Sequence, residues 1–384
     1  MKFHLMQTGV IGRRGELEQG MAGQRPELYQ RYLEEIKGYV RLADELGYAG
    51  YCQPEHHLQI EGFEITNHPG MFSLFVGLHS KRMMAGTMGY TMSTHNPVRV
   101  AEEIATLDHM LKGRLFVGFT RGYHARWVDS YAAIRGTGAT TPALAKAHSD
   151  QDAINREIFE ESIQVIKKAW SSDVFSYEGK HWQFPPPGGS AGHPAYATMG
   201  KGQDEDGIVR EIGIAPHCYQ DPHPKIYGAF AHSMRTVDMW AREGGKPIVL
   251  ASDLDFCQTL WDYYGEAAKK AGRDVPQEER GAWGGFLIIN DDPQKREDLL
   301  NEHKWFWEKW FIPHGQQMPN FLIGDADEVS RQIEEAQDRL GFNELFLMFG
   351  QGHLEPERNA EELQKFADDV FPRFASKDRE GTFV

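Results

Sequence analysis

Short apolar runs alternate with longer amphipathic segments along most of the chain, and this alternation predicts the fold. The apolar runs have the length of buried strands and cover residues 2–6, 48–52, 83–92, 114–119, 225–231, 247–251, 284–290 and 343–349. A segment with helical spacing follows each run. Short strands between helices are typical of a parallel sheet that is covered on both faces. Eight strand–helix units in one chain indicate a closed (β/α)8 TIM barrel rather than two open sheets.

The first long helical segment has clear start and stop signals. Pro26 stands at a favourable first helical position, and Gly47 is a typical C-terminal stop. Between them, apolar residues recur at three- and four-residue spacing: Leu28, Tyr32, Leu33, Ile36, Val40, Ala43 and Leu46. We expect further helices near 69–81, 97–112 and 154–170. The alternative fold is an open, doubly wound sheet, but no glycine-rich dinucleotide-binding turn follows the first strand.

Two long segments interrupt the alternation, one after the fourth strand and one after the seventh. Residues 172–224 are rich in proline, glycine and polar residues, whereas residues 301–323 are unusually aromatic. Long loops in compact domains are usually functional lids or mobile segments, and a lid is one role open to 172–224. For 301–323, a lid and an extra helix on the barrel wall or at a subunit contact are equally open. We interpret residues 1–384 as one domain without a linker.

Composition and charge exclude some classes of function but say little about the fold. The formal net charge of −15 disfavours nucleic acid or an anionic membrane as the main partner, since both require a basic face. No secretory signal is evident, and no run approaches the roughly 20 apolar residues needed to span a bilayer. We therefore expect a cytoplasmic protein. The cysteines, Cys52, Cys218 and Cys257, lack paired spacing, so we expect no disulfide, cysteine zinc site or catalytic cysteine.

Polar clusters follow four of the predicted strands, at the barrel end where active sites lie. After strands two to five, these are Glu55, His56 and His57; His95 and Asn96; Thr120, Arg121, Tyr123 and His124; and His232, Ser233, Arg235 and Thr236. The acid–imidazole cluster after strand two suits proton transfer, a metal site or a solvated turn. A metal site would need further ligands from His95, His124 or His232.

Arg121 and the Ser233 turn both suit a phosphate group. The guanidinium of Arg121 offers a fork of donors that matches a phosphate. An arginine at a strand end of an acidic chain favours a binding role for it. Ser233 stands at a predicted helix start, where backbone amides attract an anion. The alternative for Ser233 is ordinary helix capping. Together the two residues predict a phosphate grip that faces a histidine.

The residues that carry this chemistry resemble the bacterial luciferase-like, flavin-dependent monooxygenase family. The resemblance extends over nearly the whole chain and is strongest in one long ordered block, residues 86–123. It also includes EHH at 55–57, FEESIQVIKKAW at 159–170 and PHPKIYGAFAHS at 222–233. It implies a (β/α)8 barrel that binds reduced flavin mononucleotide (FMN), supplied by a separate NAD(P)H:flavin reductase. It further implies activation of O2 as a flavin C4a-hydroperoxide, and a homodimer or higher homo-oligomer through the outer helices.

The resemblance also assigns residues to roles. His56 matches the catalytic histidine, and Glu55 lies beside the flavin. Arg121 matches the phosphate-binding arginine, and the Ser233–Met234 turn matches the phosphate loop. Met88–Gly89 stands where the family often has a cis non-proline peptide under the flavin ring. No residue is assigned to a metal.

Two departures from the family pattern bear on light emission. Thr120 stands where light-emitting members have a reactive cysteine, and Ser233 and Met234 stand where luciferase has an acid and a serine. Neither change removes flavin binding, and we do not expect luminescence.

We expect an FMN-dependent monooxygenase that oxygenates a small organic substrate, with an aldehyde or ketone as the leading candidate. The alternatives are a deazaflavin-dependent oxidoreductase, a metal-dependent TIM-barrel hydrolase that uses His56, His57 and a distant histidine, and a non-catalytic flavoprotein or partner subunit.

Overall fold

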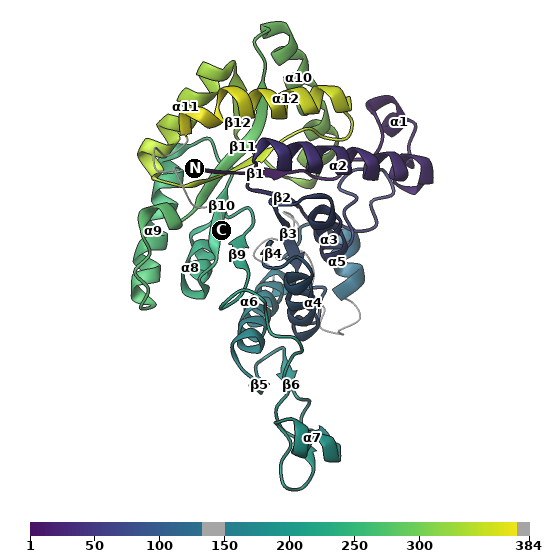
Figure 1. The fold of residues 1–384 in the computed structure, drawn as a ribbon, viewed down its shortest axis with the longest axis vertical. Coiled ribbons are helices and arrows are strands. Elements are labelled where there is room, and N and C mark those ends of the chain that lie inside the picture. The colour runs from purple at the N-terminus through teal and green to yellow at the C-terminus, as the bar shows by residue number, and fades with distance from the viewer. Residues whose placement is uncertain (133–149, 375–384) are drawn as a thin grey trace. The chain divides into compact units, whose positions relative to one another are not determined.

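The protein is described by a computed structural model that covers residues 1–132 and 150–374 and contains two compact units. The first unit combines residues 1–89 with the chain from residue 226 onward, and the second unit comprises residues 90–225. Each unit is described separately below, with the element labels of Figure 1.

The first unit contains a continuous parallel sheet. Its strands, in the order in which they pair, are β9 (Lys225–Gly228), β10 (Lys246–Val249), β11 (Ala282–Ile289), β13 (Glu344–Met348), β1 (Lys2–Met6), β2 (Gly50–Gln53) and β3 (Met84–Thr91). The remaining strand, β4 (Leu115–Thr120), belongs to the second unit. These eight strands are the eight that the apolar runs predict, and the chain has the predicted (β/α)8 barrel fold. A ninth strand, β12 (Phe321–Gly324), pairs with β11 and was not predicted.

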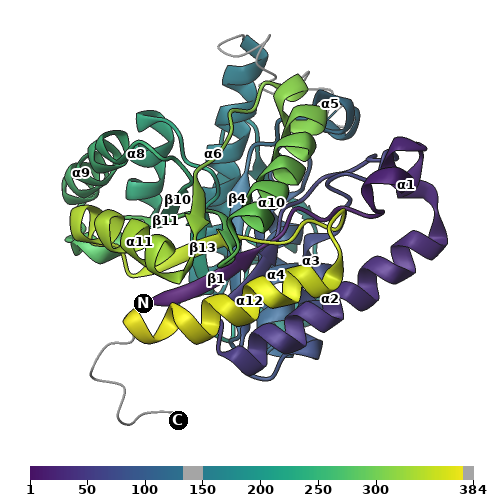
Figure 2. The same cartoon turned by 90° about the horizontal axis from the view of Figure 1, so that it is seen from above.

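The helices of the first unit are α1 (Arg14–Glu18), α2 (Pro26–Leu46), α3 (Pro69–His79), α8 (Met234–Glu243), α9 (Leu254–Lys270), α10 (Pro293–Phe306), α11 (Ala326–Leu340) and α12 (Pro356–Asp369). Among them, α2 and α3 begin and end close to the predicted positions. Gly47 ends α2 with a left-handed φ of 91°, which explains why glycine stands there. Figure 2 shows α2 and α12 side by side next to β1. In the described residues, no helix has both the length and the apolar composition of a membrane span.

A buried ionic cluster occupies the N-terminal end of the first unit's sheet. Lys246, at the start of β10, lies 3.2 Å from the carboxylate of Glu344 at the start of β13, and 3.1 Å from that of Glu279. The Tyr227 hydroxyl donates to Glu344 at 3.0 Å. Because charges this deeply buried require partners, the cluster holds the strand starts in register. Its place at the N-terminal end of the sheet indicates a structural role.

The second unit consists of helices and small hairpins around β4. Its elements are α4 (Pro97–Met110), α5 (Ala125–Ala132), α6 (Asp150–Ser171), β5 (Tyr177–Glu178), β6 (Gln183–Phe184), β7 (Ser190–Ala191), α7 (Pro194–Met199) and β8 (Ile208–Val209). β5 pairs with β6, and β7 pairs with β8, in antiparallel fashion. Helices α4 and α6 pack together, and the Trp170 indole of α6 donates to the carbonyl of Ala101 at 3.1 Å.

The long segment 172–224 belongs to the second unit and leads from a helix to a strand. The segment leaves the C-terminal end of α6 and leads to the start of β9, which makes it a helix-to-strand connection (Figure 1). Gln220, near its end, donates to the carbonyl of Leu115, the first residue of β4, at 2.9 Å and to Asp108 of α4 at 2.7 Å. These contacts place it at the N-terminal end of β4. Active sites of this fold are built from the opposite, strand-to-helix loops.

Candidate active site

The acid–imidazole cluster lies on the loop that follows β2, as predicted, but it divides into two separate pairs. In the first pair, His57 Nε2 lies 2.8 Å from Glu55 Oε1. The carboxylate of Glu55 is fully buried, whereas His57 is partly exposed. His56 turns to a different acid. The two neighbouring imidazoles therefore pair with different acids.

His56 pairs with Glu64, an acid from the far end of the same loop. Its Nε2 lies 3.2 Å from Glu64 Oε1, and both side chains are buried. The backbone N–H of His56 donates to the carbonyl of Thr66 at 2.8 Å, which closes the loop on itself. Glu64 has a left-handed φ of 49°, a conformation that is uncommon for a residue with a side chain. This left-handed residue lies where the loop turns back, and the turn brings the Glu64 carboxylate to His56.

The aromatic segment 301–323 covers this loop. The indole N–H of Trp310 donates to Glu64 Oε2 at 2.7 Å. Phe63, the neighbour of Glu64, stacks on the Trp310 ring with centroids 4.9 Å apart and also stacks on Phe306. Trp310 lies in a π-helical turn, Trp307–Phe311, which continues α10. Of the two interpretations of this segment, its buried aromatic side chains support a fixed wall of the site.

Glu64 and Trp310 are the residues that sequence reasoning missed. Glu64 lies in the polar stretch EGFEITN with no strand end or motif beside it, and Trp310 is one of several aromatic residues in its segment. Only the folded contacts single them out. The one available signal was that an aromatic segment and a second acid both occur in long loops of a barrel protein.

Hydrogen bonds among buried polar residues hold the base of this loop. The Gln53 amide, at the end of β2, donates to the Tyr32 hydroxyl at 2.8 Å, and the Thr66 hydroxyl donates to the Gln53 amide oxygen at 3.1 Å. The Tyr51 hydroxyl donates to Gln7 at 2.7 Å. Burial raises the pKa of Tyr32, so its hydroxyl stays protonated at neutral pH. The network therefore supplies position rather than acid–base chemistry.

The peptide between Met88 and Gly89 is cis, as the family resemblance predicted. It lies in the C-terminal half of β3, and Met88 is buried. β3 pairs with β2 in parallel, and the last paired residues are Gln53 and Thr87. The peptide therefore directly follows the part of β3 that is paired with the strand leading to His56.

Arg121 follows β4 in the second unit, as predicted. Its Nη1 lies 2.6 Å from Asp152 Oδ1, and its backbone carbonyl accepts hydrogen bonds from Ser93 at 3.1 Å and Asn155 at 3.4 Å. The side chain is 23% exposed. The Asp152 carboxylate thus orients the Arg121 guanidinium through Nη1. A guanidinium has five N–H donors, and a fixed orientation suits it to bind an anion.

The imidazoles of the second unit have aromatic neighbours. The His124 ring lies 4.1 Å from that of Tyr123, between centroids, and the His95 ring lies 6.0 Å from that of Tyr90. His124 is buried. Their positions after β4 and β3 are those predicted from the strand ends.

Ser233 caps helix α8, in agreement with both interpretations of this turn. Its hydroxyl oxygen accepts the backbone N–H of Thr236 at 3.3 Å, and Met234 is the first helical residue. The first turn of α8 contains no acidic side chain. Its free amides and the serine hydroxyl are donors that suit an anion.

The cysteines are free thiols, as predicted. Cys52 and Cys257 are buried, and burial raises the pKa of Cys257 to about 12. A thiol with so high a pKa is protonated at neutral pH and is a poor nucleophile.

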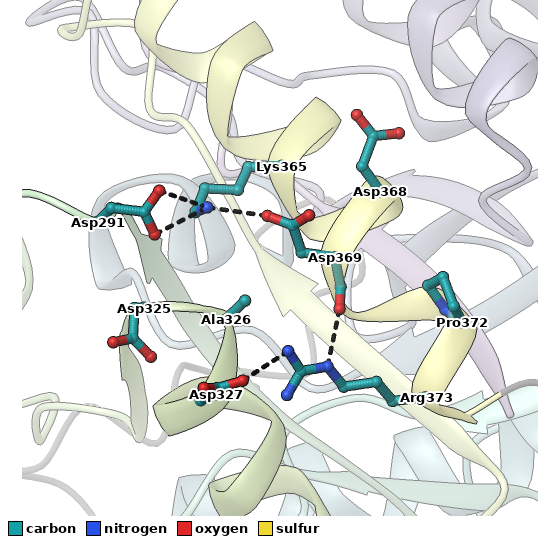
Figure 3. Close-up of a pocket in the computed structure, with 9 residues that line it drawn as sticks. All are labelled: Asp291, Asp325, Ala326, Asp327, Lys365, Asp368, Asp369, Pro372 and Arg373. Carbon is teal, nitrogen blue, oxygen red and sulfur yellow. Dashed lines mark hydrogen bonds and ion pairs between the residues drawn. The ribbon is translucent and has the colours of Figure 1, made fainter.

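An acidic hollow on the outside of α11 and α12 is shown in Figure 3. Lys365 bridges Asp291 and Asp369 at 2.9 and 2.8 Å, and Arg373 pairs with Asp327 at 2.6 Å. Both cations are thus neutralised by neighbouring acids. The lining holds no imidazole, thiol or hydroxyl, and we assign it no catalytic role.

Comparison with known proteins identifies the family. A family model described as luciferase-like monooxygenase matches residues 1–342. 3,6-Diketocamphane 1,6-monooxygenase of Pseudomonas putida is 25% identical over 281 residues, which cover 72% of this chain and 69% of the relative. The alkanal monooxygenase alpha chain of Photobacterium leiognathi is 24% identical over 288 residues, covering 73% of this chain and 67% of the relative.

Solved structures share the barrel fold. The oxygenating constituent of 3,6-diketocamphane monooxygenase from Pseudomonas putida, a type II Baeyer–Villiger monooxygenase solved in complex with FMN, aligns with a TM-score of 0.72 and 19% identity, covering 97% of this chain and 98% of that one. Monooxygenase RslO1 from Streptomyces bottropensis aligns at 0.69 and 20%, covering 98% and 100%. An F420-dependent secondary alcohol dehydrogenase in complex with an F420–acetone adduct aligns at 0.64 and 13%, covering 98% and 100%.

The family match covers most of the chain, and the structural matches cover nearly all of it. They confirm the predicted family, the predicted barrel and the prediction that the protein is an enzyme of the flavin-dependent monooxygenase class. The chain belongs to the luciferase-like monooxygenase family.

Proposed function

We propose that this protein uses reduced FMN and O2 to oxygenate a small organic substrate, with an aldehyde or ketone as the leading candidate. The observation that carries the proposal is a buried imidazole, His56, held by a buried carboxylate, Glu64, on the loop after β2 of a luciferase-like barrel. The relative of known structure bound to FMN is the oxygenating constituent of a Baeyer–Villiger monooxygenase, which supports both the cofactor and a carbonyl substrate.

The residues present suit FMN. Its phosphate requires cationic and N–H donors, and Arg121 in the second unit and the N-terminal turn of α8 at Ser233–Met234 in the first unit each offer donors of this kind. Its ring requires a flat, mainly apolar surface, and the buried Met88–Gly89 peptide of β3 is a candidate for one side of it. We assign Glu55 to the same cofactor site, where its carboxylate orients His57.

His56 is proposed to transfer the proton of the reaction. When bound, reduced FMN would supply the electrons that activate O2. Because Nε2 of His56 faces the Glu64 carboxylate, Nε2 carries a proton and Nδ1 is the basic ring atom. Nδ1 can take a proton from the substrate or return one to it, and general acid–base catalysis of this kind contributes roughly 100- to 10,000-fold to a rate. The stacked Phe63 and Trp310 keep bulk water from the Glu64 side of the imidazole.

Cofactor binding tests the proposal directly. Purified protein is titrated under argon with reduced FMN and, separately, with reduced riboflavin, which lacks the phosphate. Arg121→Ala is expected to weaken FMN at least tenfold, as expected for loss of a charge-assisted contact worth about 1.5–3 kcal/mol, and to leave riboflavin nearly unchanged. Equal losses for both flavins would refute the phosphate role. His56→Ala is expected to bind FMN normally and to lose product formation; normal turnover would remove His56 from the mechanism.

A deazaflavin-dependent oxidoreductase is the second candidate, because an F420-dependent dehydrogenase shares the fold. The same titration with reduced F420 separates the two. Tighter binding of F420 than of FMN, with no consumption of O2, would favour hydride transfer over oxygenation.

We also propose that the protein works as a homodimer or larger homo-oligomer and receives its flavin from a separate reductase. Helix α3 supports self-association because it is apolar on both faces. Phe72 and Val76 are buried, whereas Met71 and Leu78 are 65% and 69% exposed. Light scattering is expected to show a dimer in the native protein. The double change of Met71 and Leu78 to glutamate is expected to give monomers, and an unchanged dimer would exclude this helix.

A further inference from the structure

The proton-transfer residue of the proposed reaction is held by a three-residue chain that begins in the aromatic segment. Trp310 Nε1 donates to Glu64 Oε2 at 2.7 Å, and Glu64 Oε1 faces His56 Nε2 at 3.2 Å. His56 and Glu64 share one loop, whereas Trp310 lies 246 residues beyond Glu64 in the sequence. Glu64 uses one carboxylate oxygen for each neighbour, so the two contacts are made at the same time.

We propose that Glu64 is the positioning residue that fixes the tautomer and ring orientation of His56, and that Trp310 holds Glu64 in place. This inference rests on the proposed function only where it assigns His56 to proton transfer. The arrangement itself is independent of any cofactor.

The chemistry of the donors and acceptors fixes the direction of the chain. An indole N–H can only donate, so Glu64 Oε2 is an acceptor, which an ionised carboxylate satisfies. In the ionised carboxylate Oε1 is also an acceptor, so His56 Nε2 carries the proton. The basic nitrogen of the neutral ring is Nδ1. A carboxylate that orients an imidazole in one tautomer is a known way to prepare a general base.

Burial makes this control strong. Glu64 is 1% exposed and His56 is 6% exposed, so solvent does not screen the contact. Trp310 is also buried, and its ring is stacked on Phe63, the residue next to Glu64. The ring of Phe63, next to Glu64 in the chain, and the ring of Trp310, the donor to Glu64, therefore pack against each other. Loss of the indole donor would remove one of the contacts that hold the carboxylate toward His56.

Trp305 offers a matched control in the same segment. It is buried, and its ring also lies close to Phe63, with centroids 6.2 Å apart. Its indole nitrogen, however, has no hydrogen-bond partner among the described residues. Replacing either tryptophan by phenylalanine removes similar volume beside Phe63, but only Trp310→Phe removes a donor to Glu64.

The test reads the tautomer of His56 by nuclear magnetic resonance, in protein labelled with 15N-histidine and without added cofactor. The protein has 17 histidines, and His56→Gln identifies the signals of His56. We expect the native protein to favour the Nε2–H form by at least about tenfold, as expected for a contact with a charged acceptor. Glu64→Gln is expected to reverse this preference, since the Trp310 N–H holds the amide oxygen and leaves the NH2 group to face Nε2. Trp310→Phe should reduce the preference several-fold, and Trp305→Phe should leave it unchanged.

The proposal is overturned if Glu64→Gln leaves the His56 signals unchanged, or if the two tryptophan variants shift them equally. Circular dichroism of each variant checks that the fold is retained. Failure of the proposed function is separate, because it would appear as no binding of reduced FMN by the native protein while the tautomer result stayed the same.

Discussion

Glu362 allows a quantitative test of the electrostatics of the barrel. Its carboxyl lies on α12, 2% exposed, and one oxygen accepts the backbone N–H of Ile289 at 3.2 Å. The other oxygen has no hydrogen-bond partner among residues 1–132 and 150–374. Burial raises the pKa of Glu362 from 4.5 to about 8, against smaller opposing effects of the Ile289 amide and Arg358. Unlike Glu64, which has a donor on each side, Glu362 is stable when it is protonated.

The sign of the pH dependence follows from this raised pKa. Between its ordinary pKa and about 8, the folded protein keeps a proton that the unfolded chain releases. The contribution of Glu362 is therefore most favourable at low pH and is lost as the pH rises through about 8. At about 1.4 kcal/mol per pH unit, the loss between pH 5 and pH 9 is about 4 kcal/mol.

Glu362→Gln removes this titration while keeping the shape of the side chain. The free energy of unfolding is measured by denaturant at pH 5, 7 and 9 for the native protein and the variant. The free energy of unfolding of the variant is expected to rise relative to that of the native protein as the pH rises, by several kcal/mol between pH 5 and pH 9. Glu361→Gln, the exposed neighbour on the same helix, is the control and should show no such trend. A difference between Glu362→Gln and the native protein that does not change with pH would refute the reasoning.

Three further predictions concern the stability of the barrel. Lys246→Met removes the ammonium group beside the buried Glu344 carboxylate and is expected to destabilise the protein by about 3–5 kcal/mol in denaturant unfolding; a loss below about 1 kcal/mol would show that the cluster is not a supporting contact. Burial lowers the pKa of His303 from 6.5 to about 4, so the native protein should lose stability as the pH falls from 6.5 toward 4, and His303→Phe should flatten this acid loss in thermal unfolding curves. Gly284→Ala would place a Cβ against the Phe346 carbonyl of the neighbouring strand and is expected to lower the melting temperature; a melting temperature equal to that of the native protein would contradict this close approach.

The fold was predictable from the sequence because each buried strand and each helix carries its own local signal. Pro26 and Gly47 mark the ends of α2 within the sequence itself. The segment 172–224 was recognisable as a long insertion because it interrupts the alternation of strand and helix signals. A segment that follows a strand lies at the C-terminal end of the barrel strands, and one that follows a helix lies at their N-terminal end. Segment 172–224 follows α6, a helix.

The site was predictable only where it lies at strand ends. His56, Glu55 and Arg121 directly follow strands, so their positions could be inferred. Glu64 and Trp310 are placed by a loop that folds back and by an aromatic helix that covers it, and both depend on packing between distant segments. No period or spacing in the sequence records such contacts.

The central claim is that this barrel binds reduced FMN and presents it to O2. Native protein is mixed under argon with reduced FMN, the bound fraction is measured, and oxygen is then admitted while the absorbance of oxidised flavin is followed. The account predicts stoichiometric binding, and a return of the oxidised spectrum with a time course distinct from that of free flavin. If reduced FMN does not bind, or if its oxidation in the presence of the protein is identical to that of free flavin, the account is contradicted.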